Sequence, residues 1–356
     1  MQMEHEIWER ASQIYGDILP EFVRVRVQAE LDGILGAGHA ALFTIAQKRM
    51  ENTLLHGWRA VSRGYVGASA VVFFLGITEV NPLPPHYLCP RCRYHALMGD
   101  GRAVSGFDLP PKACPRCGGH LNGNGHDLPF ETLLGPDGRK LPHINLYFAR
   151  TYLENEDEYM RERLADTLLM PKARPHPMPD LYHDLEARTG IPVSDVPPWD
   201  VNSCRLLIAA SESGKIPGME KPRLHRLLHE KQPQTMRALV QTFGLAHRTA
   251  IPFLKSEESQ ISEEISTQET VMRYFIGKGI GFRQAFDLAE QVSYGITAAQ
   301  GFAPCAEELL RTHGVPEEYL QDCKKIHYLY SEAHIIACLI DGFRIAWYYN
   351  HLNELT

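Results

Sequence analysis

The sequence predicts an α+β protein of two or three domains, and three observations support this class. The length of 356 residues and the apolar content of 44% suffice for more than one buried core. Helical patterns open the chain, four paired cysteines follow, and most of the last 150 residues have helical periodicity. We therefore expect a mixed unit at 1–150, an acidic and then proline-rich linker at 151–199, and a helical unit at 200–356.

Glycine and proline positions divide the start of the chain into three helices. The first is expected over residues 2–16, and the second begins at Pro20, because proline suits the first turn of a helix. Apolar residues in the second helix recur at helical spacing up to Gly36. A third helix is expected over residues 40–55, before Gly57. Ordinary amphipathic core helices account for all three.

A glycine-containing turn follows these helices. A strand-like stretch at 58–61 leads into the turn, and an apolar helix begins at about Val66. Backbone N–H groups at such a helix start form an anion site, and a neighbouring guanidinium adds positive charge. The residues that would contact a phosphate are Ser62, Arg63 and Gly64. A turn without a ligand is the simpler interpretation of the pattern alone.

Four cysteines form the most specific pattern in the chain. Two Cys-x2-Cys pairs are separated by 21 residues, and the four are Cys89, Cys92, Cys114 and Cys117. Two such turns supply the four thiolates of a tetrahedral zinc site. Because four cysteines leave no position for water, we expect a structural zinc in a module at about 81–130. A redox or disulfide role is less favoured, since no thioredoxin-like pattern surrounds the pairs.

Runs of residues around the cysteines are more specific than the spacing. They are Ile14–Glu21, Val61–Ser69, Asn81–Tyr87, Ser105–Pro110, Gly125–Glu131 and Leu141–Phe148. Together with later runs, including Thr235–Gln241 and His313–Ile326, they resemble C-family replicative DNA polymerases of the PolC type (DNA polymerase III alpha subunit) over about residues 10–352. The resemblance implies a remnant of a polymerase-beta-like nucleotidyltransferase palm, a zinc module and a helical, fingers-like domain.

Two substitutions separate this chain from that family. The family run Pro-Asp-Ile-Asp-Leu-Asn-Phe carries the palm aspartates that hold catalytic Mg2+, and this chain has His143 and Asn145 at those positions. A ring nitrogen and a neutral amide are poor substitutes for the hard oxygen ligands of Mg2+. The second palm half, with its third aspartate, has no counterpart except Asp166. The resemblance therefore implies a truncated, degenerate paralogue without a catalytic site, and Mg2+ binding is not expected.

Basic residues are concentrated in the helical part although the chain has a net charge of −7. Residues 201–250 contain eight Lys or Arg against three Glu, and Lys324 and Lys325 lie in a later run that resembles the family. We expect Arg223, Arg226 and the two lysines to contact phosphates of duplex or primer-template DNA. A solvated helical face is the alternative interpretation. Glu332 replaces a lysine of the family, which would repel a triphosphate nearby.

These observations favour a non-catalytic protein that binds nucleic acid or a replication or repair partner. An active metal-dependent DNA polymerase, completed by Asp166 and a partner subunit, is the first alternative. A structural scaffold that does not touch nucleic acid is the second. We expect a cytoplasmic protein, since the chain shows neither a signal peptide nor an apolar run of membrane-spanning length. The oligomeric state is left open.

Overall fold

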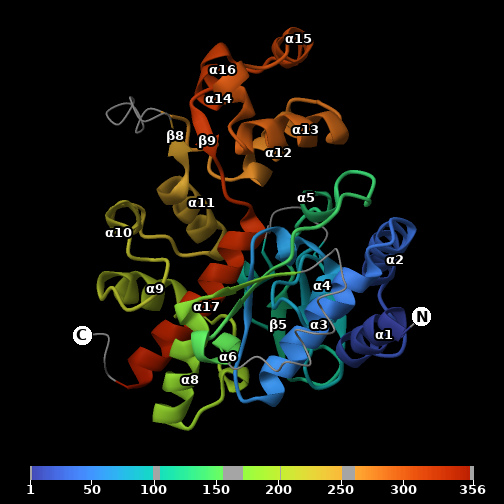
Figure 1. The fold of residues 1–356 in the computed structure, drawn as a ribbon, viewed down its shortest axis with the longest axis vertical. Helices are drawn as coiled ribbons and strands as arrows, with labels where there is room; N and C mark the ends of the chain where they lie inside the picture. The colour runs from blue at the N-terminus through green and yellow to red at the C-terminus, as the bar shows by residue number, and fades with distance from the viewer. Residues whose placement is uncertain (1, 99–104, 155–170, 201, 251–260, 353–356) are drawn as a thin grey trace.

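The computed structural model describes residues 2–98, 105–154, 171–200, 202–250 and 261–352. Figure 1 shows the N-terminal helices on one side of the molecule, a group of late helices at its far end, and the long helix α17 (Glu332–His351) between them. Helices and short strands alternate in the first half, whereas helices dominate the second. The mixed α+β class predicted from the sequence is therefore confirmed.

The three predicted N-terminal helices are confirmed almost to the residue. They are α1 (Gln2–Tyr15), α2 (Glu21–Gly36) and α3 (Ala40–Leu55). Pro20 stands immediately before α2 with an extended backbone. The N–H group at this position makes no hydrogen bond within a helix, so proline costs the helix nothing there. Ile7, Val27 and Phe43 are fully buried in one core that includes residues from Met3 to Tyr152.

A three-stranded sheet lies against these helices. Its strands are β1 (Val61–Arg63), β6 (Asn145–Phe148) and β7 (Lys172–Pro175), in the order β1-β6-β7. Strands β1 and β6 are antiparallel, while β6 and β7 are parallel. The strand predicted at 58–61 begins later, because its pairing with β6 starts at Val61, opposite Tyr147. The 3-10 helix η1 (Tyr65–Ala68) and helix α4 (Ala70–Phe74) follow β1.

The cysteine-rich segment forms a second, separate sheet. Its antiparallel strands, in the order β3-β2-β5-β4, are β2 (His86–Leu88), β3 (His95–Leu97), β4 (Lys112–Ala113) and β5 (His120–Asn124). The 3-10 helix η2 (Gly106–Asp108) precedes β4, and helix α5 (Glu131–Leu134) follows β5. Tyr87, Leu121 and two of the cysteines form a small core of their own. The module is thus packed as a unit around its cysteines.

The stretch expected to be a linker contains regular structure. Helix α6 (Arg150–Glu154), strand β7, helix α8 (Pro177–Thr189) and the 3-10 helix η3 (Val193–Asp195) lie there. The prolines have structural positions: Pro175 ends an edge strand, and Pro177 stands in the first turn of α8. The His176 side chain caps α8 by accepting the Met178 N–H. The proline-rich composition of this stretch therefore did not reveal strand β7 and helix α8.

The C-terminal part is mostly helical, as predicted. Its elements are α9 (Ser203–Glu212), α10 (Pro222–Lys231), α11 (Met236–His247), β8 (Thr249–Ala250), α12 (Gln268–Gly277), α13 (Phe282–Ser293), α14 (Ile296–Gln300), α15 (Pro304–Thr312), α16 (Glu317–Cys323), β9 (Ile326–Tyr328) and α17. Two hydrophobic cores divide them. One surrounds α17 with α8 to α11, and the other joins residues between Ile261 and Leu329. Helix α17 also contacts β1 and η1, so it connects the two halves of the chain.

Candidate metal centre and glycine-loop site

The four predicted cysteines lie together in the module. The Sγ atoms of Cys89 and Cys117 are 3.5 Å apart, as are those of Cys92 and Cys114, and all four lie within 4.8 Å of one another. A Zn–S bond of about 2.3 Å gives a tetrahedron with edges of about 3.8 Å. The four thiol groups are therefore able to hold a metal ion, and they fill a tetrahedral coordination sphere.

Two equivalent turns position the cysteines. In the first turn the Arg93 N–H donates to the Cys89 carbonyl at 2.9 Å, and in the second the Gly118 N–H donates to the Cys114 carbonyl at 2.9 Å. Both donor residues have positive φ, 58° at Arg93 and 70° at Gly118. Glycine adopts that conformation without steric cost, whereas Arg93 is strained there. The repeat explains why a Cys-x2-Cys spacing suffices to predict the site.

The module is attached to the rest of the chain by polar contacts. The Asp108 carboxylate accepts the N–H groups of Met236 at 2.6 Å and Arg237 at 3.1 Å, so it caps the start of α11. Burial raises the pKa of Asp108 despite these bonds. On the other side, the Tyr15 hydroxyl and His86 Nε2 are 2.9 Å apart, which joins the module to α1. Loss of the module's structure would therefore disturb both halves of the chain.

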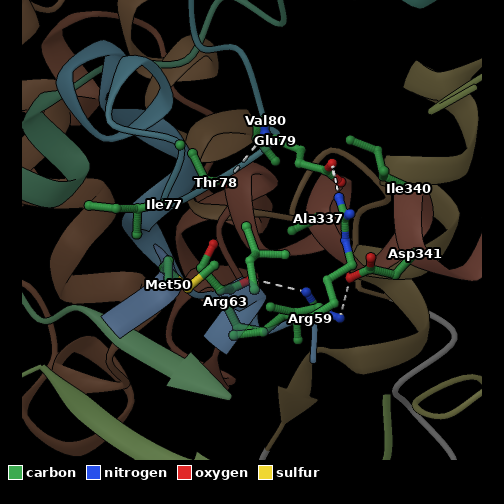
Figure 2. A pocket seen from close by; sticks show the side chains of 15 residues that line it. Met50, Arg59, Arg63, Ile77, Thr78, Glu79, Val80, Ala337, Ile340 and Asp341 are labelled. Atoms are coloured by element: carbon green, nitrogen blue, oxygen red, sulfur yellow. Dashed lines mark hydrogen bonds and ion pairs between the residues drawn. The ribbon is translucent and has the colours of Figure 1, made fainter. Parts of the chain in front are cut away.

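In the glycine loop, Arg63 makes a buried ion pair. Its Nη2 lies 2.6 Å from Asp341 Oδ2, both side chains are 6% exposed, and Nη1 donates to the Ser62 carbonyl at 2.9 Å. Figure 2 shows Arg63 and Asp341 pointing toward each other at a cavity of about 220 Å³. Burial lowers the pKa of Arg63, but the Asp341 carboxylate outweighs it, and the net shift is upward. Arg63 is thus a charged residue whose charge is balanced inside the protein.

The anion position at the helix start is occupied by the chain itself. Glu30, fully buried on α2, accepts the N–H groups of Ala70 at 3.0 Å and Val71 at 3.1 Å, and the Ser69 hydroxyl at 2.5 Å. Arg26 pairs with the same carboxylate. At the start of α4, therefore, the group that accepts these donors is a side chain of the protein, whereas phosphate binding at Ser62, Arg63 and Gly64 stays a prediction.

Gly64 has a similarly defined environment. Its φ of 87° favours glycine, and a Cβ atom there would lie 3.3 Å from Asn145 Nδ2. The Gly64 N–H donates to His334 Nδ1 at 3.1 Å. Since this N–H has a protein acceptor and Ser62 is buried, phosphate binding by the loop remains a prediction that would require rearrangement.

The two strand positions that distinguish this chain lie beside the loop. Asn145 is partly buried and pairs with Arg63 across β1 and β6, whereas His143 is exposed just before β6. Residues two apart on an extended segment point to one face. That face therefore presents an imidazole and an amide. Asp166 lies outside the described residues.

The four basic residues predicted to contact DNA lie in two places. Arg223 and Arg226 are on α10, which packs on α9 and α11, while Lys324 and Lys325 follow α16 in the other helical core. The Arg226 side chain is 67% exposed, 4.0 Å from Glu230. Lys324 pairs with Glu307, and Lys325 Nζ lies 3.0 Å from Asp322. The structure thus separates the pairs, and the lysines have intramolecular partners.

Glu332 belongs to a buried charged cluster that the sequence did not reveal. It pairs with Arg273, and its N–H donates to Glu269 Oε2 at 2.9 Å. Burial, and then the Glu332 carboxylate, raise the pKa of Glu269 to about 8. Among the described residues Glu269 Oε1 has no hydrogen-bond partner. Burial and the neighbouring carboxylate thus disfavour the charged form of Glu269, whereas Glu332 makes the ion pair with Arg273.

The sequence does contain one indication of such buried ion pairs, namely charged residues within otherwise apolar helices. Asp341 and Arg344 interrupt the apolar sequence of α17, and Arg344 pairs with Glu79. A charge in such a helix is tolerated when it is paired. Within the described parts of the chain, no helix combines the length and apolarity needed to cross a bilayer.

Comparisons with known proteins identify the relatives of this chain. Residues 1–169 match the family described as the bacterial DNA polymerase III alpha NTPase domain. The DNA polymerase III PolC-type proteins of Thermotoga maritima and Bacillus subtilis are 28% and 29% identical over 458 and 459 aligned positions, covering 96% and 97% of this chain. The alignments cover only 33% and 32% of those proteins, so the chain spans about a third of their length. Over nearly all of its length, the chain is therefore similar to part of the PolC-type DNA polymerase III proteins.

Proposed function

We propose that this protein is a catalytically inactive PolC-like chain that binds nucleic acid through its phosphates, alone or with a replication or repair partner. The observation that carries the proposal is the face before and on β6, where His143 and Asn145 replace the expected carboxylates. Two-metal phosphoryl transfer needs carboxylates that hold both ions close together. An amide and an imidazole do not supply that charge.

The length of the alignments supports the same conclusion. The 458 aligned positions of the Thermotoga maritima protein exceed the 356 residues of this chain by 102. The relative therefore has at least that many residues without a counterpart here. A difference of this size is large enough to account for the proposed loss of the second palm half and its third aspartate.

For the cysteine centre we propose a structural zinc ion. Cys89, Cys92, Cys114 and Cys117 would hold it, and four thiolates leave no site for a substrate or water. The ion would stabilise the module that caps α11 through Asp108. Its contribution is therefore to folding, and through folding to the position of the α9–α11 helices.

The proposed nucleic-acid surface is centred on α10. The structure removes two residues from the basic count, because Arg248 donates to the backbone carbonyls of Ile261, Ser262 and Ile265, and Lys231 Nζ lies 2.6 Å from Glu263. Arg226 remains exposed on α10, and Arg205 on α9 is also exposed. Such surface cations bind phosphates without reading sequence, and their affinity falls with salt.

A charge-reversal experiment tests this surface. Arg223→Glu with Arg226→Glu should weaken binding to a labelled primer-template duplex and reduce the slope of log K against log salt by about 0.9 for each phosphate that the variant no longer neutralises. Arg226→Glu alone has a matched control in Arg283→Glu, because Arg283 is 66% exposed and 3.9 Å from Asp287, as Arg226 is 67% exposed and 4.0 Å from Glu230. Fluorescence anisotropy at several salt concentrations measures both. Equal effects of the two reversals, or no binding at low salt, would support a scaffold instead.

A further inference from the structure

A cavity of about 660 Å³ lies between the cysteine module and the helical part of the chain. The module contributes η2 and strand β5 to its lining, and the helical part contributes residues 197–200, Cys204 on α9 and the residues just before α11. The rings of Phe107 and Trp199 stack across these two parts, with centroids 5.8 Å apart and an interplanar angle of 9°. The cavity is therefore formed where the module packs on the helices.

Prolines and a tryptophan give this cavity rigid apolar walls. Pro110–Pro111 from the module and Pro197–Pro198 from the helical part are exposed, and Trp199 is only half-buried. The proline ring fixes φ, and the Tyr87 hydroxyl donates to the Pro110 carbonyl at 2.7 Å. A surface that is already ordered loses little conformational entropy when a ligand binds. The walls are thus suited to hold an apolar group from outside the chain.

The charge of the lining is negative. Its carboxylates are Glu79, Asp108 and Asp200, and no Lys or Arg lines the cavity in the described parts of the chain. Glu79 pairs with two arginines, and Asp108 caps α11. Asp200 is half-buried, and its Oδ1 accepts the Asn202 N–H at 2.7 Å and the Ser203 hydroxyl at 3.2 Å. Because these donors are neutral, Asp200 attracts a cation and repels phosphates.

We propose that this cavity is a docking site for an extended peptide segment of a protein partner, which places an apolar side chain on Trp199 and a lysine or arginine at Asp200. A cation beside the tryptophan ring is attracted by both the ring face and the carboxylate. The volume lies in the range of about 300–1,000 Å³ of sites that enclose a ligand. Asn122 and Gln234 also line the cavity and can bond a peptide backbone. The inference rests on the proposed partner binding and names the chemistry of the partner.

The probe is a phage-displayed library of random heptapeptides, selected on the immobilised full chain. We expect the selected sequences to share a lysine or arginine at a fixed spacing from a proline, leucine or aromatic residue. The consensus peptide is then synthesised with a fluorescent label, together with a version that has glutamate at the basic position. Anisotropy should show saturable binding of the consensus peptide that weakens with salt, and roughly 10-fold or more weaker binding of the glutamate version.

Two variants with matched controls test the cavity itself. Trp199→Leu should weaken binding of the consensus peptide by roughly 10- to 30-fold. Trp347→Leu is its control, because Trp347 is also half-buried and stacked on a ring, that of His351, outside the cavity. Asp200→Asn keeps the oxygen that accepts both hydrogen bonds, and should weaken binding by roughly 3- to 10-fold and reduce its salt dependence. Asp184→Asn, at a 60% exposed position outside the cavity, should bind as the parent chain does.

Several outcomes would overturn the proposal. They are the absence of a shared motif, a motif without a basic residue, and equal effects of Trp199→Leu and Trp347→Leu. Light scattering that shows a dimer dissociated by Trp199→Leu would assign the cavity to a second copy of the chain, and displacement of the peptide by a single-stranded oligonucleotide would assign it to nucleic acid. Circular dichroism checks folding, and Asp200→Asn still tests the site if Trp199→Leu is unfolded.

The peptide site and the α10 surface are tested independently. The Arg223 and Arg226 reversals should leave binding of the consensus peptide unchanged, and Asp200→Asn should not weaken binding of the primer-template duplex. A chain that selects the peptide but binds no duplex would retain this inference and lose the proposed DNA binding. Duplex binding without a peptide motif would give the opposite result.

Discussion

The buried pair between Arg63 and Asp341 predicts a large loss of stability when one charge is removed alone. Asp341→Asn preserves the shape of the side chain and keeps an acceptor for the Tyr182 hydroxyl, which donates to Oδ1 at 2.5 Å. The substitution leaves the Arg63 guanidinium 6% exposed and without its counter-charge. Breaking a buried pair in this way costs about 3–5 kcal/mol.

A double-mutant cycle separates the pair from its surroundings. Arg63→Met should also cost about 3–5 kcal/mol, because it leaves Asp341 buried and charged. Combining both substitutions removes both charges. The unfolding free energy lost by the double variant should therefore be about 2–3 kcal/mol smaller than the sum of the two single losses. A positive coupling of this size would show that the two side chains neutralise each other in the folded protein.

Urea unfolding, followed by circular dichroism and tryptophan fluorescence, measures these losses. The surface pair of Arg283 and Asp287, 66% and 50% exposed, provides the control, since an exposed pair contributes about 0–1 kcal/mol. The reasoning would be refuted if Asp341→Asn cost no more than Asp287→Asn, or if the losses in the cycle were additive.

Three further predictions concern the metal centre, the buried carboxylates and catalysis. Cys92→Ser should lower both the zinc content and the melting temperature, because a structural metal contributes folding energy; elemental analysis showing unchanged metal would contradict this. The stability that parent Glu269 contributes should be lost between about pH 4.5 and 8, because the folded protein holds its proton up to a pKa of about 8, so the difference in unfolding free energy between the parent and Glu269→Gln should fall by at most about 1.4 kcal/mol per pH unit; a difference in urea midpoints that does not change with pH would count against it. His143→Asp with Asn145→Asp should not extend a primer with Mg2+ or Mn2+, since it restores only two carboxylates; extension that depends on Asp166 would favour the active-polymerase alternative.

The helices at the start of the chain could be predicted because their boundaries are local. Pro20, Gly36 and Gly57 mark the ends, and the apolar spacing between them is helical. Strands were harder, since β1 has three residues and is defined by its pairing with a strand more than 80 positions later. Strand β7 was concealed for the same reason, because its prolines suggested a linker and only the parallel pairing with β6 makes it a strand.

The candidate sites divide in a similar way. The cysteine centre was predictable because each Cys-x2-Cys turn is built from neighbouring residues. For the glycine loop the sequence did not reveal that Arg63 pairs with Asp341 or that Glu30 accepts the N–H groups at the start of α4, because nothing in the local sequence links these acids to that segment. The count of basic residues at 201–250 could not show that two of them, Arg248 and Lys231, bind groups of the protein itself. Sequence patterns predict sites built from neighbouring residues, whereas the ion-pair and hydrogen-bond partners of a side chain often come from distant segments that only the fold brings close.

The parallel pairing of β6 and β7 has a consequence for how this protein tolerates changes in length. Both strands run in one direction, so the chain between Phe148 and Lys172 has to return along the sheet. The register of the sheet is fixed by the strands and not by the length of that return. The closure entropy of a loop rises only slowly with its length, by about 0.6 kcal/mol for each doubling. This crossover is therefore the insertion point of choice: a segment from a longer relative, or a reporter domain, could be placed there with the sheet and the helix behind it left intact.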